Sequence, residues 1–248
     1  MASQGSVLVT GASRGLGAHI ARRLAADGWP VAVNHLPDPE DAARVVDTIV
    51  AAGGTAAAFR ADVTDEDDVA ALLPAVEARL GPVRVLVPNA TGPQPSRPAT
   101  EVTWEHHLDQ LRFFVKSPTL LMQAALPGMR RLGGGRIVQI GSDMPERAEP
   151  GMSAYAAAKA AQLSLTRTWA RELGPLGITV NLVAPGWIPV ERHAAIGAEH
   201  VERYRRDVPL ARMGTPAEVA DVVAFLASDG ARFVTGERIA VNGGHVMG

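Results

Sequence analysis

The residues best suited to proton transfer in this sequence are a tyrosine and a lysine four positions apart, Tyr155 and Lys159. They lie in an alanine-rich segment that favours a helix, where side chains at positions i and i+4 project from the same face. A lysine ammonium beside a phenol stabilises the phenolate and lowers a pKa that starts at about 10. The pair would then donate or accept a proton near neutral pH. The chain has two tyrosines and two lysines in all, and the alternative is a surface pair without function.

A serine is expected close to this pair. Ser142 directly follows a predicted strand over residues 135–141, so it lies at the carboxyl end of that strand. Open α/β sheets bind their ligands outside the carboxyl ends of the strands. A hydroxyl at that edge can hydrogen-bond a carbonyl oxygen held beside Tyr155.

A glycine-rich segment follows the first apolar run and opens a predicted helix. Glycines at such a turn let the backbone pass close to a pyrophosphate, and the helix N-terminus offers N–H groups and partial positive charge. The glycine spacing is Gly-x-x-x-Gly-x-Gly, so an ordinary turn remains the alternative. The residues expected to contact phosphate or the adjoining ribose are Gly11, Ser13, Arg14, Gly15, Leu16 and Gly17.

Short apolar runs alternate with longer helical patterns along most of the chain, a pattern typical of a parallel sheet covered by helices on both faces. The predicted strands are 6–10, 30–34, 55–60, 83–87, 135–141, 177–183 and 238–241. The predicted helices are 16–27, 39–52, 65–79, 101–131, 152–173 and 215–227. We therefore predict an α/β fold with a doubly wound, seven-stranded parallel sheet.

No linker, charge block or repeat divides the chain, so residues 1–248 are expected to form a single domain. The polar stretch 187–212 interrupts the alternation of strands and helices. Long connections in compact domains are usually functional, and we expect this one to be a lid. A plain surface insertion is the alternative.

Composition excludes several classes of protein. The net charge of −2 and the 4% of aromatic residues do not suit a nucleic-acid binder. The absence of cysteine excludes disulfides, thiolate catalysis and thiolate-bound zinc, and the seven histidines are scattered, so no metal site is predicted. No apolar run approaches a membrane span and no signal peptide is recognisable, so a cytoplasmic location without membrane contact is expected.

Taken together, these motifs resemble the short-chain dehydrogenase/reductase family, whose fold is a Rossmann fold. The resemblance covers nearly the whole chain and lies in residues 10–17, Asp62-Val63, Asn89-Ala90, Ser142, Tyr155-x-x-x-Lys159 and Pro185-Gly186. The wording of residues 135–138, 177–181, 183–186 and 242–244 is most similar to 3-oxoacyl-[acyl-carrier-protein] reductases and related ketoreductases.

The resemblance implies a role for each catalytic residue. Tyr155 would be the general acid that protonates a carbonyl oxygen, and Ser142 would hydrogen-bond that oxygen. Lys159 would bind the ribose hydroxyls of the nicotinamide cofactor and depress the pKa of Tyr155. Beyond the glycine-rich turn, the residues expected to contact the cofactor are Asn34, His35, Asp62, Val63, Asn89, Ala90, Tyr155, Lys159, Pro185, Gly186 and Ile188.

We expect the cofactor to be NADPH rather than NADH. The second strand ends in Asn34 and His35, without the acidic side chain that would repel a 2′-phosphate. Arg14 in the glycine-rich turn can reach that phosphate. Asp38 and Glu40 nearby favour the opposite choice.

Four positions depart from the family's usual wording. The long helix lacks the asparagine that kinks it and holds a water linked to the lysine; Phe114 occupies that place, and we expect a straighter helix there. The first Asn and the Gly of the family's Asn-Asn-Ala-Gly are replaced around Asn89. Val190 replaces a threonine that contacts the nicotinamide amide, and Asn242 replaces an aspartate. We expect a backbone carbonyl to hold the relay water unaided; slow resupply of the proton is the alternative.

The leading hypothesis is an NADPH-dependent ketoreductase that acts on a small or acyl-carrier-bound ketone. The alternatives are an NAD(P)-dependent dehydrogenase of a small polyol or cyclic alcohol, and a nucleotide-binding protein with little turnover. Trp187 and His193 are candidates for the walls of the substrate pocket. A homotetramer is expected through helices 101–131 and 152–173, which carry the following surplus apolar residues: Leu108, Leu111, Phe113, Leu120, Leu121, Leu163, Leu165 and Trp169.

Overall fold

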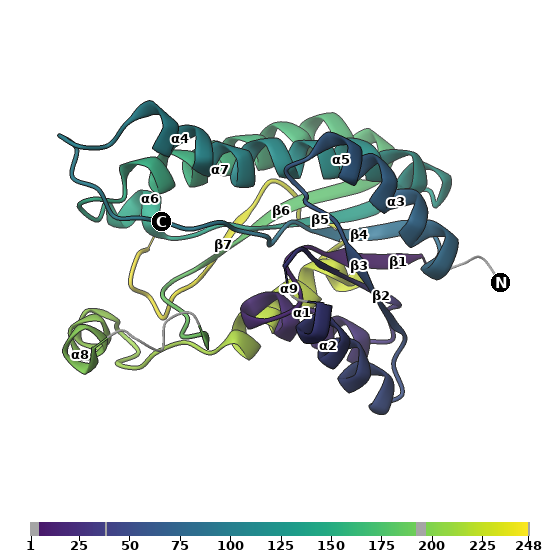
Figure 1. Ribbon diagram of the computed structural model, residues 1–248, viewed down its shortest axis with the longest axis horizontal. Coiled ribbons are helices and arrows are strands. Elements are labelled where there is room, and N and C mark those ends of the chain that lie inside the picture. The colour runs from purple at the N-terminus through teal and green to yellow at the C-terminus, as the bar shows by residue number, and fades with distance from the viewer. Residues whose placement is uncertain (1–4, 38, 192–196, 248) are drawn as a thin grey trace.

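The computed structural model describes residues 5–37, 39–191 and 197–247, which form a central sheet between two layers of helices (Figure 1). The seven strands pair in parallel in the order β3-β2-β1-β4-β5-β6-β7. Their bounds are β1 Ser6–Val9, β2 Val31–His35, β3 Ala56–Arg60, β4 Val83–Val87, β5 Gly135–Ile140, β6 Ile178–Pro185 and β7 Arg238–Val241. This arrangement confirms the predicted α/β fold class and doubly wound sheet. The strand order reverses between β1 and β4, where such folds bind ligands.

Two apolar cores lie on opposite faces of the sheet, because successive side chains of a strand point to opposite sides. In β1, Val7 and Val9 pack in one core and Leu8 packs in the other. The first core is covered by α1 Gly15–Ala26, α2 Pro39–Ala51 and α9 Pro216–Ala227. The second is covered by α3 Glu66–Leu80, α5 Ser117–Arg131 and α7 Ser153–Leu173 (Figure 1). Burial on both faces explains the unbroken apolar runs of the strands.

The predicted helix 101–131 is not a single straight helix. It begins at Trp104 and consists of α4 Trp104–Leu111, a π-helical turn η1 Arg112–Lys116, and α5. Phe114 lies within the π turn and is buried. The expectation of a straighter helix was therefore wrong. The helix forms a π turn around the buried Phe114, although it has no asparagine there.

The predicted lid, residues 187–212, contains a helix that we did not predict, because the segment is polar. α8 Ala198–Asp207 buries one side chain, Tyr204, and lies at the far end of the molecule from α2 (Figure 1). His193 and Asp38 lie outside the described residues. The structure also has three short helical turns: α6 Met144–Arg147, η2 Gly174–Leu176 and η4 Asp229–Ala231.

Within the described residues, no helix is both long and apolar enough to cross a membrane.

Two of the eight residues on which the tetramer expectation rested are buried inside the subunit. Leu121 and Trp169 are part of the second core, so they cannot serve an interface between subunits. The other six residues of that set are half-buried.

Candidate active site

Lys159 lies on α7 against the carboxyl end of β5 and is buried, with 4% of its surface exposed. Its Nζ donates to the carbonyl oxygen of Ile140 at 2.6 Å and to Oε1 of Gln162 at 3.1 Å. A buried ammonium is unfavourable unless it is paired and hydrogen-bonded, and these two oxygens meet that need. The lysine is thereby tied to the edge of the sheet where Ser142 begins the next loop.

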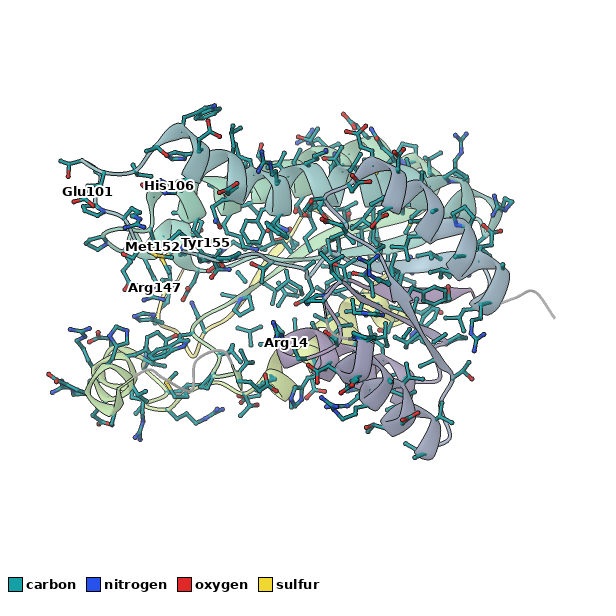
Figure 2. The ribbon with its side chains drawn as sticks, viewed as in Figure 1. Arg14, Glu101, His106, Arg147, Met152 and Tyr155 are labelled. Atoms are coloured by element: carbon teal, nitrogen blue, oxygen red, sulfur yellow. The ribbon has the colours of Figure 1, made fainter. Side chains whose placement is uncertain are left out.

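Tyr155 lies one helical turn before Lys159, as the spacing predicted. The Lys159 Nζ is 5.8 Å from the centroid of the Tyr155 ring. The Phe114 ring meets the Tyr155 ring edge to face, with centroids 5.4 Å apart and an interplanar angle of 80°. Figure 2 shows Tyr155 on the α7 side of the sheet and Arg14 on the α1 side, at one end of the strands.

Ser142 follows β5 directly, and its Oγ accepts a hydrogen bond from the Met144 N–H at 3.1 Å. A hydroxyl has one proton to donate and can accept as well. Because the backbone N–H occupies an acceptor position, the Ser142 proton remains suited to donation toward a substrate oxygen. Together Ser142, Tyr155 and Lys159 provide two hydroxyl donors and a cation at the carboxyl edge of the sheet.

The glycine-rich turn is tightly packed at the start of α1. A Cβ on Gly17 would lie 2.3 Å from the Gly11 carbonyl oxygen and 2.5 Å from Asn89 Nδ2, so only glycine fits. The side chain of Arg14, the N-cap residue of α1, makes no capping hydrogen bond, and the first turn of α1 has no acidic residue. Such a helix end suits a pyrophosphate. The residues present therefore fit a dinucleotide cofactor.

Two asparagine side chains fix the shape of this turn. The Asn34 Oδ1 accepts from the Gly11 N–H at 3.2 Å, and its Nδ2 donates to the Ala61 carbonyl at 3.1 Å. The Asn89 Nδ2 donates to the Thr10 carbonyl at 2.8 Å. The Asn34 side chain thus joins the glycine-rich turn to the segment after β3, and its predicted contact with the cofactor stays a prediction.

Thr10 is a site residue that sequence reasoning missed. Its Oγ1 accepts from the backbone N–H groups of Asn89 at 2.9 Å and Ala90 at 3.0 Å. These bonds join the glycine-rich turn after β1 to the loop after β4, across the point where the strand order reverses. A threonine directly before the first glycine was the available signal.

The remaining predicted cofactor residues lie at the same edge. Asp62 follows β3, and its Oδ1 accepts from the Thr64 N–H at 2.9 Å and the Thr64 hydroxyl at 2.8 Å. Pro185 ends β6, and the Gly186 N–H donates to the Val241 carbonyl at 3.1 Å. The others lie as follows: His35 ends β2 and is buried, Val63 is buried in the second core, Ala90 packs against that core, Ser13 and Leu16 are half-buried in the turn, and Ile188 is buried in the first core.

The described start of the lid touches the glycine-rich turn. A Cβ on Gly15 would lie 3.7 Å from the Val190 Cβ and 3.6 Å from the Glu191 Oε2. A carboxylate repels a phosphate, so a bound pyrophosphate requires the Glu191 side chain to turn away. Val190 therefore lies beside the glycine-rich turn, and the contact with the nicotinamide amide implied by the resemblance stays a prediction.

A second cluster connects the lid to the loop after Ser142. The Tyr204 hydroxyl accepts from the Trp187 N–H at 2.8 Å, and the two rings meet edge to face with centroids 5.3 Å apart. The His245 ring lies 4.8 Å from the Tyr204 ring, and its Nδ1 is 3.7 Å from Asp143 Oδ2. Burial raises the pKa of the Asp143 carboxyl, although the nearby Arg147 opposes this. Trp187 therefore packs under α8, a position that the sequence alone did not indicate.

No group of three or more histidine and carboxylate side chains among the described residues is arranged to hold a metal ion. Tyr155, Ser142 and Lys159 lie at the carboxyl edge of the sheet, on the same edge as the glycine-rich turn. A doubly wound sheet with this arrangement at its carboxyl edge defines a nucleotide-binding oxidoreductase of the Rossmann class.

Comparison with known proteins identifies the family. A family model described as enoyl-(acyl carrier protein) reductase matches residues 11–245. The 3-oxoacyl-[acyl-carrier-protein] reductase FabG of Staphylococcus aureus is 41% identical to this chain over 98% of each. The chain belongs to the short-chain dehydrogenase/reductase family, as its motifs predicted.

Solved structures share the fold closely. A blue fluorescent protein from a metagenomic library, solved in complex with NADPH, is 38% identical, with a TM-score of 0.91 and 99% coverage of each chain. The gluconate 5-dehydrogenase from Burkholderia cenocepacia, solved with NADP and tartrate, is 30% identical with a TM-score of 0.91. That similarity covers 98% of this chain and 95% of the gluconate dehydrogenase.

Proposed function

We propose that this protein is an NADPH-dependent ketoreductase that reduces the ketone of a 3-oxoacyl thioester, a polyketide-like compound or a similar carbonyl substrate. The observation that carries the proposal is the placement of Ser142, Tyr155 and Lys159 at one sheet edge, beside the glycine-rich turn. Similarity to a 3-oxoacyl-[acyl-carrier-protein] reductase supports an acyl-carrier-bound substrate. The similar structures solved with NADPH and NADP support the choice of cofactor.

Each residue has a distinct task in this proposal. The turn at Gly11–Gly17 and the N-terminus of α1 bind the pyrophosphate, and Lys159 binds the nicotinamide ribose. The bound cofactor supplies the hydride. Ser142 donates a hydrogen bond to the substrate carbonyl oxygen and fixes its position, and Tyr155 delivers a proton to the same oxygen. The charge that develops on that oxygen is thus met by two hydroxyl donors and a nearby cation.

A substrate panel followed at the nicotinamide absorbance tests the proposal. Purified protein is supplied with NADPH and 3-oxoacyl thioesters or small ketones, and separately with NADP⁺ and polyols or cyclic alcohols. Fastest turnover on a 3-oxoacyl thioester supports the proposal. The gluconate 5-dehydrogenase similarity supports a second candidate, oxidation of a small polyol, and fastest turnover on polyols would favour it. Cofactor binding without turnover on any compound would favour a nucleotide-binding protein.

NADPH is expected to be used with higher catalytic efficiency than NADH. Arg14 is exposed at the start of α1, where its guanidinium can pair with a 2′-phosphate. Glu40, in the first turn of α2, favours the opposite choice, because a carboxylate repels that phosphate. Hydrogen bonds to charged groups contribute about 1.5–3 kcal/mol, so we expect about a 10- to 100-fold preference in kcat/KM. Arg14→Ala should reduce kcat/KM for NADPH and leave that for NADH nearly unchanged. Equal efficiency of the two cofactors in the unmodified protein would contradict the prediction.

A homotetramer is expected in solution. Six of the eight predicted interface residues keep part of their surface exposed, namely Leu108, Leu111, Phe113, Leu120, Leu163 and Leu165, and Trp104 is 63% exposed. Faces of this kind are commonly covered by another subunit. Light scattering at micromolar concentration should give four times the chain mass of 26.0 kDa. A monomeric mass would reject the prediction.

A further inference from the structure

A phenyl ring lies directly against the Lys159 ammonium. The Nζ is 3.6 Å from the centroid of the Phe114 ring, and both side chains are buried. A cation this close to a ring face is attracted by the negative π surface, and the attraction grows when water is excluded. Phe114 therefore supplies a third favourable contact to an ammonium that already donates to Ile140 and Gln162.

The same ring also contacts the tyrosine. Its T-shaped contact with the Tyr155 ring, at 5.4 Å and 80°, is a favourable geometry for two aromatic rings. The π-helical turn brings Phe114 against both residues. Phe114 thus contacts both Tyr155 and Lys159, which have catalytic roles in the proposed reaction.

On its other side, Lys159 is held by a buried polar chain. Gln162 is 1% exposed, and its Oε1 accepts from the lysine. The Gln162 backbone carbonyl accepts from Thr166 Oγ1 at 3.0 Å, and Thr166 Oγ1 accepts from Gln139 Nε2 at 3.0 Å. These bonds connect α7 to Gln139, near the carboxyl end of β5, and restrict the turn of α7 that carries Lys159.

We propose that Phe114 and Gln162 are positioning residues that hold the Lys159 ammonium in place to bind the cofactor ribose. The inference rests on the proposed function, because the proposed function is what gives Lys159 a role in binding the cofactor. The ring supplies a π surface and Gln162 supplies an acceptor, and neither residue contacts the reacting atoms. The ammonium is thus fixed by protein groups where the family's usual arrangement employs an asparagine-held water.

Nuclear magnetic resonance of the lysine side chains tests the contact itself, independently of activity. The chain has two lysines, and Lys116 is partly exposed and paired with Glu66 at the surface, so it serves as an internal reference. Ring currents should move the Lys159 Hε signals upfield of those of Lys116. Phe114→Leu should abolish that displacement, and Phe114→Tyr should keep it. Phe113→Leu is the matched control, because its ring packs against Gly92, and it should leave the Lys159 signals in place.

A double-mutant cycle tests the role in cofactor binding. Phe114→Leu and Gln162→Met should each raise the Kd for NADPH by about 2- to 30-fold, measured by fluorescence titration. Phe114→Tyr and Gln162→Glu should recover most of the affinity. In a Lys159→Met background, Phe114→Leu should cause no further loss, because its effect passes through the lysine.

Each other outcome has a definite meaning. If Lys159→Met binds NADPH as tightly as the unmodified protein, the ribose role of Lys159 fails and the inference fails with it. If Lys159→Met weakens binding but Phe114→Leu and Gln162→Met do not, the inference is overturned while the proposed function stands. A variant that melts at lower temperature with unchanged Kd and unchanged lysine signals would show a purely structural role and would overturn it too.

Discussion

Tyr155→Phe is expected to lower kcat by about 10²- to 10⁴-fold, the usual contribution of a positioned proton transfer. The substitution removes only the hydroxyl. The phenyl ring keeps its T-shaped contact with Phe114, and Lys159 keeps its bonds to Ile140 and Gln162. Folding and NADPH affinity should therefore change little, so that the loss appears in turnover alone.

Three measurements on the same preparation separate these effects: steady-state turnover on the best substrate of the panel, NADPH affinity by fluorescence titration, and melting temperature. Loss of turnover together with loss of cofactor affinity would indicate a displaced helix and would say nothing about proton transfer. If the Phe variant keeps more than about a tenth of the activity with normal affinity, Tyr155 is not the general acid.

Gly17→Ala is expected to impair cofactor binding severely. The new Cβ would lie 2.3 Å from a backbone oxygen of the same turn, and backbone cannot move aside as a flexible side chain can. Overpacking of this kind typically costs about 1–3 kcal/mol, and the turn must shift to relieve it. We expect the Kd for NADPH to rise by at least about tenfold and the free energy of unfolding to fall by about 1–3 kcal/mol.

Gly174→Ala is the matched control for that substitution. Gly174 has no neighbour within 4 Å of an added Cβ, and its φ of −52° is open to alanine. Its melting temperature and NADPH affinity should stay close to those of the unmodified protein. If Gly17→Ala also binds NADPH normally, the turn does not approach the cofactor in the way that we propose.

The sequence was informative wherever one physical constraint acts on many neighbouring residues. The strands were predictable because both faces of a parallel sheet are buried, so that residues such as Val7, Leu8 and Val9 must all be apolar. The doubly wound arrangement was predictable from the alternation of strands and helices, whereas the order of the strands was not predicted. Tyr155 and Lys159 were predictable because their spacing places them on one helix face and because both residue types are scarce here.

Contacts between distant segments were not predicted, because the local sequence marks them weakly, as at Thr10, or not at all. Thr10 joins β1 to the loop after β4, and Gln162 reaches Lys159 from within an ordinary helical pattern. The π turn was not inferred either, since no residue type in the segment 112–116 marks a single turn with i→i+5 hydrogen bonds. α8 was missed because it buries little besides Tyr204, so it has no broad apolar stripe.

In the proposed function, the N-terminus of α1, where the Arg14 side chain makes no capping hydrogen bond, links the stability of this protein to its supply of cofactor. A helix that begins without a side-chain cap keeps backbone donors for an anion, and it forgoes the roughly 1 kcal/mol that a good cap contributes. A ligand that binds only the folded chain adds about 2.7 kcal/mol of stability at a hundred times its Kd. A cell rich in the dinucleotide would therefore keep the chain folded longer, and a starved cell would expose it sooner to proteolysis. Metabolic state would thus set the lifetime of the protein as well as its rate.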